Sequence, residues 1–514
     1  MGNNNYYITT PIYYASGNPH MGHAYSSIIA DVFARFKRLD GYNVFFLTGT
    51  DEHGLKIQKA AKAGNQKPKD FCDNISKIFR DLGISLNLSN DDFIRTTEER
   101  HHKAVQFLWE KLESKGYIYL SKYKGWYSVS DEAYYNEDEI IEKDGKKISI
   151  NSGSLVEWVE EESFFFKLSS LQEKLLEFYN HNPKFILPIS RKNEVISFVK
   201  RGLKDLSISR KSFSWGIKVP NNKEHVIYVW LDALTNYISA LNFPNLEDQL
   251  FRNFWPATLH IIGKDILRFH AIYWPAFLLA ADIKPPNRVY GHGWILSDKE
   301  KMSKSKGNIL DPLEMIKTYG LDQLRYYLIK EVPFGKDGNI SNENIENCVN
   351  SDLANNYGNF CQRTFSFAEK NCKGIVPIDI DFNSEDLKLL NSFGDNINKI
   401  RSFMDNQSLN EYVKFIIDKS FDANKYFNDE APWSKKDDKK RINTIVYVSL
   451  EVIRKISILL LPIVPYSANK ALTSLNLNTE TLKLDSIVDH LSIKPGSKLN
   501  NQGILFKKID KKDD

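Results

Sequence analysis

This sequence has few cysteines, no long apolar run and no large excess of either charge. Its 514 residues include four cysteines, too few for a disulfide scaffold, and no two of them form a CxxC pair. We therefore expect a reducing compartment. The longest mostly apolar run, 456–465, is about half the roughly 20 residues of a membrane helix, and the N-terminal MGNNNYY does not resemble a signal peptide. These absences predict a soluble cytoplasmic protein that does not enter a membrane.

Composition and charge narrow the class of protein. Hydrophobic residues make up 42% and charged residues 26%, which excludes disorder, a collagen and a coiled-coil rod as descriptions of the whole chain. Basic residues number 69 and acidic residues 65, a net charge of +4. This balance allows local basic patches for nucleic acid without indicating one. The length predicts about three domains.

An α/β pattern occurs in two separate parts of the chain. In residues 1–115, a strand pattern at 6–14 is followed by a helical pattern at 20–39 and by a fully apolar strand at 44–47. Strand, helix and strand in this order predict a doubly wound parallel sheet. The pattern resumes in residues 223–350, with strands expected at 260–263 and 287–296 and a helix at 266–281.

Two regions differ from this pattern. Residues 116–222 are rich in Tyr, Glu, Lys and Ser, and we interpret them as an inserted domain between the two α/β halves. Residues 351–493 carry only helical patterns and predict an all-α bundle. Residues 494–514 are expected to form a loosely held tail. The helices of the bundle are expected at 353–370, 384–403, 409–427 and 441–461.

The first chemical motif is His20-Met21-Gly22-His23, which follows a strand and opens a helix. Ligands of open α/β sheets bind at this position, near the helix N-terminus. Two histidines three residues apart lie on one helix face and are suited to donate hydrogen bonds to phosphate oxygens. Gly22 would let a base or ribose approach the backbone. Taken alone, the motif is equally consistent with two surface histidines.

The second motif, 301–305, reads Lys-Met-Ser-Lys-Ser and follows a predicted strand of the second α/β half. Lys301, Ser303, Lys304 and Ser305 could hold a triphosphate and neutralise a departing pyrophosphate. A lysine run by itself usually means a solvated loop. The two motifs together favour nucleotide chemistry, because each follows a strand in a different half of one split domain.

This pair of motifs resembles the signature of the class I aminoacyl-tRNA synthetases. Further segments resemble the methionyl-tRNA synthetase family, and the resemblance extends over about residues 6–465. It implies a Rossmann-type catalytic domain, an inserted connective domain and an α-helical anticodon-binding domain. The further segments are TTPIYY at 9–14, TGTDEHG at 48–54, YVWLDA at 228–233, GKDI at 263–266 with FH at 269–270, and APW at 431–433.

The resemblance also implies roles for single residues. Catalysis would fall to His20, His23, Lys301 and Lys304, and ATP would be bound by these four with Gly22, Ser303 and Ser305. Asp51 would meet the ammonium group of methionine, and a thioether calls for an apolar, aromatic pocket. Core or surface positions are the competing interpretation for most of these side chains. The methionine pocket would comprise Ile12, Tyr14, Asp51, Trp230, Ala233, Tyr237, Ile266 and His270, and the anticodon would be read by Asn359, Arg363 and Trp433.

The implied activity is attachment of methionine to initiator and elongator tRNA through a methionyl-adenylate, with ATP, Mg²⁺ and release of pyrophosphate. Many relatives hold zinc through CxxC pairs in the insertion, whereas here no cysteine lies between Cys72 and Cys348, so we expect no structural zinc. A histidine and carboxylate site remains conceivable, with His181 and His225 near the edges of the insertion. The chain also has no room for the dimerising C-terminal domain of some relatives, and we expect a monomer.

Other functions remain possible from the sequence. Synthetases for leucine, isoleucine or valine carry a longer editing insertion, and a cysteine-specific enzyme would need a metal–thiolate pocket. A tRNA-binding protein without catalysis is disfavoured by the intact histidines and lysines. A small-substrate nucleotidyltransferase with HxGH would not need the helical domain around Trp433.

Overall fold

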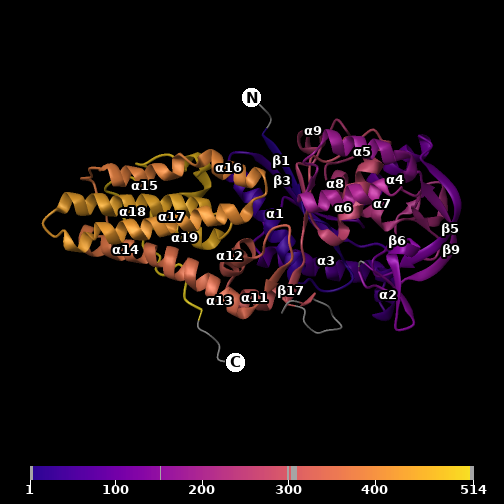
Figure 1. The fold of residues 1–514 in the computed structure, drawn as a ribbon, viewed down its shortest axis with the longest axis horizontal. Helices are drawn as coiled ribbons and strands as arrows, with labels where there is room; N and C mark the ends of the chain where they lie inside the picture. Colours follow the sequence, from indigo (N-terminus) through magenta and orange to yellow (C-terminus); the bar gives the residue numbers. More distant parts are fainter. Residues whose placement is uncertain (1–3, 151, 298–299, 302–309, 510–514) are drawn as a thin grey trace. The chain divides into compact units, whose positions relative to one another are not determined.

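The computed structural model describes residues 4–150, 152–297, 300–301 and 310–509. The chain forms two compact units, coloured along the sequence in Figure 1. The first comprises the chain up to Ala30 together with Val44–His292, and the second comprises Asp31–Asn43 together with the chain from Gly293 onward. Helix α1 (Met21–Leu39) contributes residues to both.

A seven-stranded sheet organises the first unit. Its strand order is β10-β16-β15-β1-β3-β2, with β4 also paired to β3. The pairings β1–β15, β15–β16, β10–β16, β2–β3 and β3–β4 are all parallel. The predicted doubly wound parallel sheet is therefore confirmed. The strands are β1 (Asn5–Thr9), β2 (Tyr13–Tyr14), β3 (Asn43–Asp51), β4 (Asp92–Arg95), β10 (Ile186–Leu187), β15 (Leu259–Gly263) and β16 (Val289–His292).

Helix α1 buries the face that its apolar spacing predicts. Five apolar residues of α1, Ile28, Ile29, Val32, Phe33 and Phe36, are fully buried. The strand expected at 6–14 is in fact two strands, because Pro11 lies between them and has no N–H for a ladder. The other helices of this unit outside the predicted insertion are α2 (Leu55–Ala63), α3 (Pro68–Ser85), α4 (Glu99–Ser114), α7 (Val229–Leu234), α8 (Asn236–Ser239), α9 (Gln249–Phe254) and α10 (Trp274–Ala280).

The predicted insertion contains an antiparallel sheet of four strands in the order β11-β9-β5-β6, of which β5, β6 and β9 are labelled and drawn in purple in Figure 1, and a β7–β8 hairpin. Within the same residues, β10 pairs with β16 and so belongs to the main sheet. The boundaries 116–222 stay a prediction. The elements are β5 (Ile118–Ser128), β6 (Ala133–Tyr135), β7 (Ile140–Lys143), β8 (Lys146–Ser149), β9 (Glu157–Phe166), α5 (Gln172–His181), α6 (Ile189–Lys200), β11 (Leu206–Ser207) and β12 (Ser209–Arg210), followed by β13 (Lys218–Val219) and β14 (Asn222–Ile227).

The second unit is mainly helical, as predicted. Helix α18 (Lys439–Leu460) is buried along most of its length and packs against α14, α15, α17 and α19, which Figure 1 shows in orange and yellow. The single helix expected at 384–403 is two helices, α15 and α16. The remaining elements are β17 (Ile295–Ser297), β18 (Glu300–Lys301), α11 (Pro312–Tyr319), α12 (Leu321–Glu331), β19 (Gly338–Ile340), α13 (Asn342–Cys348), α14 (Asn359–Cys372), α15 (Ser384–Gly394), α16 (Ile397–Asp405), α17 (Leu409–Glu430) and α19 (Pro465–Ser474).

The C-terminal segment is held more firmly than the sequence predicts. Leu499 and Phe506 are buried, and the Val376 N–H donates to the Ser497 carbonyl at 2.9 Å. The side chain of Asn350 donates to the Ile509 carbonyl at 2.9 Å. Within the described residues 494–509, two buried apolar side chains thus anchor a segment that is otherwise mostly exposed, and the loosely held tail at 494–514 stays a prediction.

Candidate active site

The two histidines of the first motif lie together where α1 begins. Their rings stack with centroids 3.9 Å apart. The His20 N–H donates to His23 Nδ1 at 3.0 Å, and the Gly22 N–H donates to His20 Nδ1 at 3.0 Å. A ring nitrogen that accepts a hydrogen bond carries no proton, so both rings hold their single proton on Nε2. Each ring therefore carries an Nε2–H donor of the kind that binds phosphate oxygens.

Neighbouring aromatic rings keep His23 neutral. Tyr13 and Phe79 place their rings 4.9 Å and 5.2 Å from the His23 ring, both edge to face. Burial lowers the pKa of His23, and the nearby His20 lowers it further. The close approach of the His20 ring also favours glycine at position 22, because a Cβ there would lie 2.9 Å from that ring.

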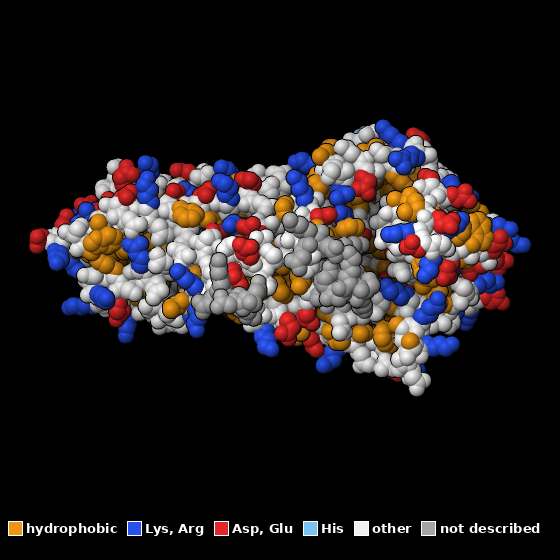
Figure 2. All heavy atoms as spheres, turned by 60° about the horizontal axis from the view of Figure 1, so that its bottom comes forward, with side chains coloured by type: hydrophobic (Ala, Val, Ile, Leu, Met, Phe, Trp, Pro, Cys, Tyr) orange, Lys and Arg blue, Asp and Glu red, His pale blue; other side chains and the backbone are white. Residues whose placement is uncertain are grey.

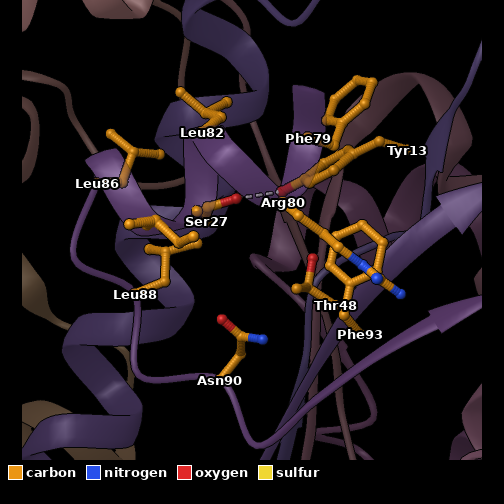
Figure 3. A pocket seen from close by; sticks show the side chains of 12 residues that line it. Tyr13, Ser27, Thr48, Phe79, Arg80, Leu82, Leu86, Leu88, Asn90 and Phe93 are labelled. Atoms are coloured by element: carbon orange, nitrogen blue, oxygen red, sulfur yellow. Dashed lines mark hydrogen bonds between the residues drawn. The ribbon is translucent and has the colours of Figure 1, made fainter. Parts of the chain in front are cut away.

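A cavity of about 250 Å³ lies beside Tyr13 and Phe79 (Figure 3). Tyr13 forms one side of it and points toward Ser27 of α1, with the two hydroxyl oxygens 2.6 Å apart. Leucine side chains and Phe93 form much of the remaining wall. Of the predicted site residues with described positions, none lines this cavity, so it is separate from the predicted methionine pocket.

The aromatic residues predicted for methionine are brought together by α7, α8 and the chain after β15. Trp230 stacks on Phe269 with ring centroids 3.7 Å apart and nearly parallel planes. The rings of Trp230 and His270 are 6.2 Å apart, and those of Tyr237 and His270 are 5.7 Å apart. Ala233 is buried one helical turn from Trp230. Ile12, Tyr14, Trp230 and Ile266 are all partly buried against one apolar core.

Backbone contacts also define the proton positions of His270. Its Nδ1 lies 3.0 Å from the Ile266 carbonyl, which can only accept, so Nδ1 carries the proton. Its Nε2 then accepts from the Tyr237 hydroxyl at 2.7 Å. Burial lowers the pKa of His270 to about 4, so the ring is neutral at pH 7. His270 lies in a π-helical turn, Phe269–Tyr273, and such turns are frequent at functional sites.

Asp51 lies at the end of β3 and is 8% exposed. Its Oδ1 is buried without a hydrogen-bond partner among the described residues. Burial, and then the charge of Asp232, raises the pKa of Asp51 well above its ordinary value. A buried, unpaired carboxylate oxygen among other carboxylates favours a cationic ligand such as an ammonium group.

Asp232, a second buried carboxylate near Asp51, is paired on both of its oxygens. It accepts from His53 Nδ1 at 2.6 Å and from His101 Nε2 at 2.7 Å, and all three residues are buried. Burial alone would raise the pKa of Asp232, but the two histidines outweigh it and lower that pKa. Helix α7, which carries Trp230, is thereby hydrogen-bonded to His53 in the chain after β3 and to His101 of α4.

Most of the second motif lies outside the described residues. Ser303, Lys304 and Ser305 belong to the undescribed part, and only the backbone of Lys301 is described, in β18. β18 pairs with β17 in a small sheet of the second unit. The predicted ATP contacts of these residues stay predictions.

The three residues predicted to read the anticodon lie in the helical unit. Asn359 is exposed, and Arg363 follows it four residues later on the same face of α14. The Arg363 guanidinium lies 5.8 Å from the Trp433 ring centroid and donates to the Asn428 side chain at 2.7 Å. Trp433 is 49% exposed, so the alternative of a buried core aromatic is wrong.

The described residues form neither a metal-binding cluster nor a membrane-spanning helix. Among the residues that the structure describes, no group of three or more His, Cys, Asp or Glu side chains is placed to hold a metal ion. Within the same residues, no helix has the length and apolar character required to cross a bilayer.

On the face shown in Figure 2, basic and acidic side chains are interspersed.

Comparison with known proteins decides the family. The family model described as tRNA synthetases class I (M) matches residues 6–365, more than half of the chain. The chain belongs to the methionyl class I tRNA synthetases. A second model, the anticodon binding domain of methionyl tRNA ligase, matches residues 376–514.

Individual methionyl-tRNA synthetases are similar over nearly the whole chain. The methionine–tRNA ligase of Rickettsia conorii is 50% identical over 515 residues, covering 99% of this chain and 100% of that protein. That of Brucella melitensis is 50% identical over 92% of each chain. The structure of Mycobacterium tuberculosis methionyl-tRNA synthetase in complex with methionyl-adenylate is 45% identical, has a TM-score of 0.95, and matches 98% of this chain and 99% of that one.

Several residues in contact with the predicted site residues or near them were not identified from sequence. Phe269, His53 and Asp232 fall inside quoted motifs, yet their types suit core packing equally well. His101 had only a neighbouring histidine as a signal. Glu132, which contacts Tyr14, had none, because its partner lies 118 residues away in the sequence.

Proposed function

We propose that this chain attaches L-methionine to its cognate tRNA in two steps. The methionine carboxylate attacks the α-phosphate of ATP in line, pyrophosphate leaves, and methionyl-adenylate forms. The methionyl group then passes to the 3′-terminal adenosine of the tRNA. The observation that carries the proposal is family membership together with the cluster of Trp230, Tyr237 and neutral His270 and a buried Asp51 oxygen that has no hydrogen-bond partner among the described residues.

The methionine side chain is assigned to the pocket of Ile12, Ala233, Ile266 and the rings of Trp230, Tyr237 and His270. Because His270 and Tyr237 hold each other in one neutral hydrogen-bonded arrangement, the pocket presents no full charge to the thioether. A soft, weakly polar sulfur favours such surroundings. Asp51, with Tyr14 beside it, is assigned to the ammonium group.

The reacting phosphates are assigned to the two motifs. His20 and His23, through their Nε2–H groups, would donate to phosphate oxygens whose charge grows in the transition state, and Gly22 would lie against the nucleotide. Lys301, Ser303, Lys304 and Ser305 would hold the triphosphate and the leaving pyrophosphate. ATP is expected to arrive as its Mg²⁺ complex, since Mg²⁺ is bound largely by substrate phosphates in such sites.

The helical unit is assigned to the anticodon. Exposed Asn359 and the Arg363 guanidinium suit base edges, and half-exposed Trp433 offers a face for an unstacked base. Initiator and elongator tRNA would both be charged if they share an anticodon. A monomer in the cytoplasm without structural zinc remains our expectation.

Pyrophosphate exchange into ATP, tested with each amino acid in turn and without tRNA, examines the proposal. Methionine should drive exchange best. Faster exchange with leucine or cysteine would show that the assigned specificity is wrong. If none of the amino acids drives exchange, the chain has lost adenylation.

A further inference from the structure

Glu132 is a buried carboxylate that connects the predicted insertion to the methionine site. It is 4% exposed and lies in the turn between β5 and β6. Its φ of 49° lies in the left-handed region that glutamate rarely adopts. Such conformations persist only where the surroundings hold them, and they cluster at functional sites.

Four groups hold Glu132 in place. Its Oε1 accepts from the Tyr14 hydroxyl at 3.2 Å and from the Lys56 N–H at 3.3 Å. Its second carboxylate oxygen accepts from the Tyr127 hydroxyl, and its carbonyl accepts from the Tyr228 hydroxyl at 2.7 Å. The carboxylate is thus an acceptor on both oxygens, and its orientation toward Tyr14 is defined.

This orientation decides how the Tyr14 hydroxyl can act. A phenol has one proton, and here that proton is donated to Glu132. Burial, and then the charges of Glu132 and Asp51, raises the pKa of Tyr14, so the phenol keeps its proton at neutral pH. The hydroxyl oxygen is then an acceptor, already approached by the Ile57 N–H, and its remaining lone pair can accept from a further donor.

Tyr14 and Asp51 are direct partners in the register of β2 and β3, so their side chains leave the sheet on the same face. An ammonium group has three N–H donors. The unpartnered Oδ1 of Asp51 satisfies one of them, and an adjacent hydroxyl oxygen would satisfy a second.

We propose that Glu132 is a positioning residue for the ammonium group of methionine. By holding the Tyr14 proton, it makes the Tyr14 oxygen an acceptor beside Asp51, and it acts on the substrate only through Tyr14. The inference rests on the proposed function and deepens its methionine site, because it assigns a specificity role to a residue outside both signature motifs.

The test compares two probes that differ only in the ammonium group. L-Methioninol has it, and 4-(methylthio)butan-1-ol lacks it. Inhibition constants for both are measured in methionine-dependent pyrophosphate exchange with wild type, Glu132→Gln and the control Glu139→Gln. Glu139 is a partly buried glutamate of the same predicted insertion, paired with Arg268 at 2.8 Å.

Glu132→Gln should weaken methioninol about tenfold, the usual loss for one hydrogen bond to a charged group, and leave the deamino probe unchanged. The control should change neither. In a Tyr14→Phe background, Glu132→Gln should add no further loss. Inhibition constants do not depend on the folded fraction, and melting temperatures show whether each variant folds.

Three results would overturn the inference while the proposed function stands. They are an unchanged methioninol constant in Glu132→Gln, an equal loss for both probes, and a full additional loss in the Tyr14→Phe background. Wild-type protein without methionine-dependent exchange would instead refute the proposed function itself.

Discussion

Replacing Trp433 by alanine should separate tRNA charging from adenylation. The ring lies in a short 3₁₀ turn, Pro432–Ser434, and is 49% exposed. Its contacts are with the Phe427 ring, 6.0 Å away edge to face, and with the Arg363 guanidinium. If an anticodon base stacks on the open face, the variant loses that stacking and keeps the catalytic residues.

The expected magnitudes follow from this exposure. Stacking is worth about 1–3 kcal/mol per base, so charging efficiency should fall by roughly 10–100-fold. A buried tryptophan would cost about 3–5 kcal/mol of stability when truncated to alanine. With half of the ring already in water, we expect at most about 2 kcal/mol. The protein should therefore stay folded at assay temperature.

The assay measures three quantities on the same preparation: tRNA charging, tRNA-independent pyrophosphate exchange and melting temperature. Phe421→Ala is the matched control, since Phe421 is another exposed aromatic of the helical unit with no assigned role. Charging should fall only for Trp433→Ala, with exchange nearly intact. Equal loss of both activities with a collapsed melting temperature would refute the stacking argument, as would unchanged charging.

Four further predictions test the catalytic site. Lys304→Ala should lower adenylation by on the order of 10²–10³-fold with little change in methionine binding, and normal turnover would show that Lys304 is a solvated loop residue. Norleucine should be a poor but measurable substrate in exchange assays, since an apolar pocket separates near-isosteres by only about 1–3 kcal/mol. Asp51→Asn should abolish methionine-dependent exchange without lowering the melting temperature at pH 7. The reason is linkage, because the pKa of Asp51 is higher in the folded than in the unfolded state. The stabilising contribution of Asp51 is therefore full below its unfolded pKa and is lost as the pH rises. A lower melting temperature of the variant at pH 7 would contradict this pH dependence. Elemental analysis should find no tightly held zinc, and about one zinc per chain would overturn that expectation.

The sequence predicted those parts of the fold that depend on local periodicity. Helix α1 and strand β3 follow directly from apolar spacing and from a continuous apolar run. Features that depend on partners far away in the sequence were not predicted. β10 is two residues long, and nothing in its own sequence shows that it pairs with β16. Likewise, the anchoring of Phe506 depends on distant helices.

For the site, residue types were predictable but their partners were not. A carboxylate in TGTDEHG and a tryptophan in YVWLDA are visible from sequence. Asp232 of α7 is held by His53, which follows β3, and by His101 of α4, while Asp51 keeps an unpaired oxygen, and these partners are far apart in the sequence. The roles of two nearby aspartates therefore differ for reasons that appear only in three dimensions.

The first motif shows why histidine, and not simply a cation, is required there. Spacing alone predicts two side chains on one helix face. In the structure, the N–H groups of His20 and Gly22 donate to the Nδ1 atoms of His23 and His20. Lysine and arginine have no acceptor, so either one would leave a backbone donor at the helix start unsatisfied. Among the basic side chains, only imidazole can accept a backbone N–H hydrogen bond on one nitrogen and donate to a phosphate from the other.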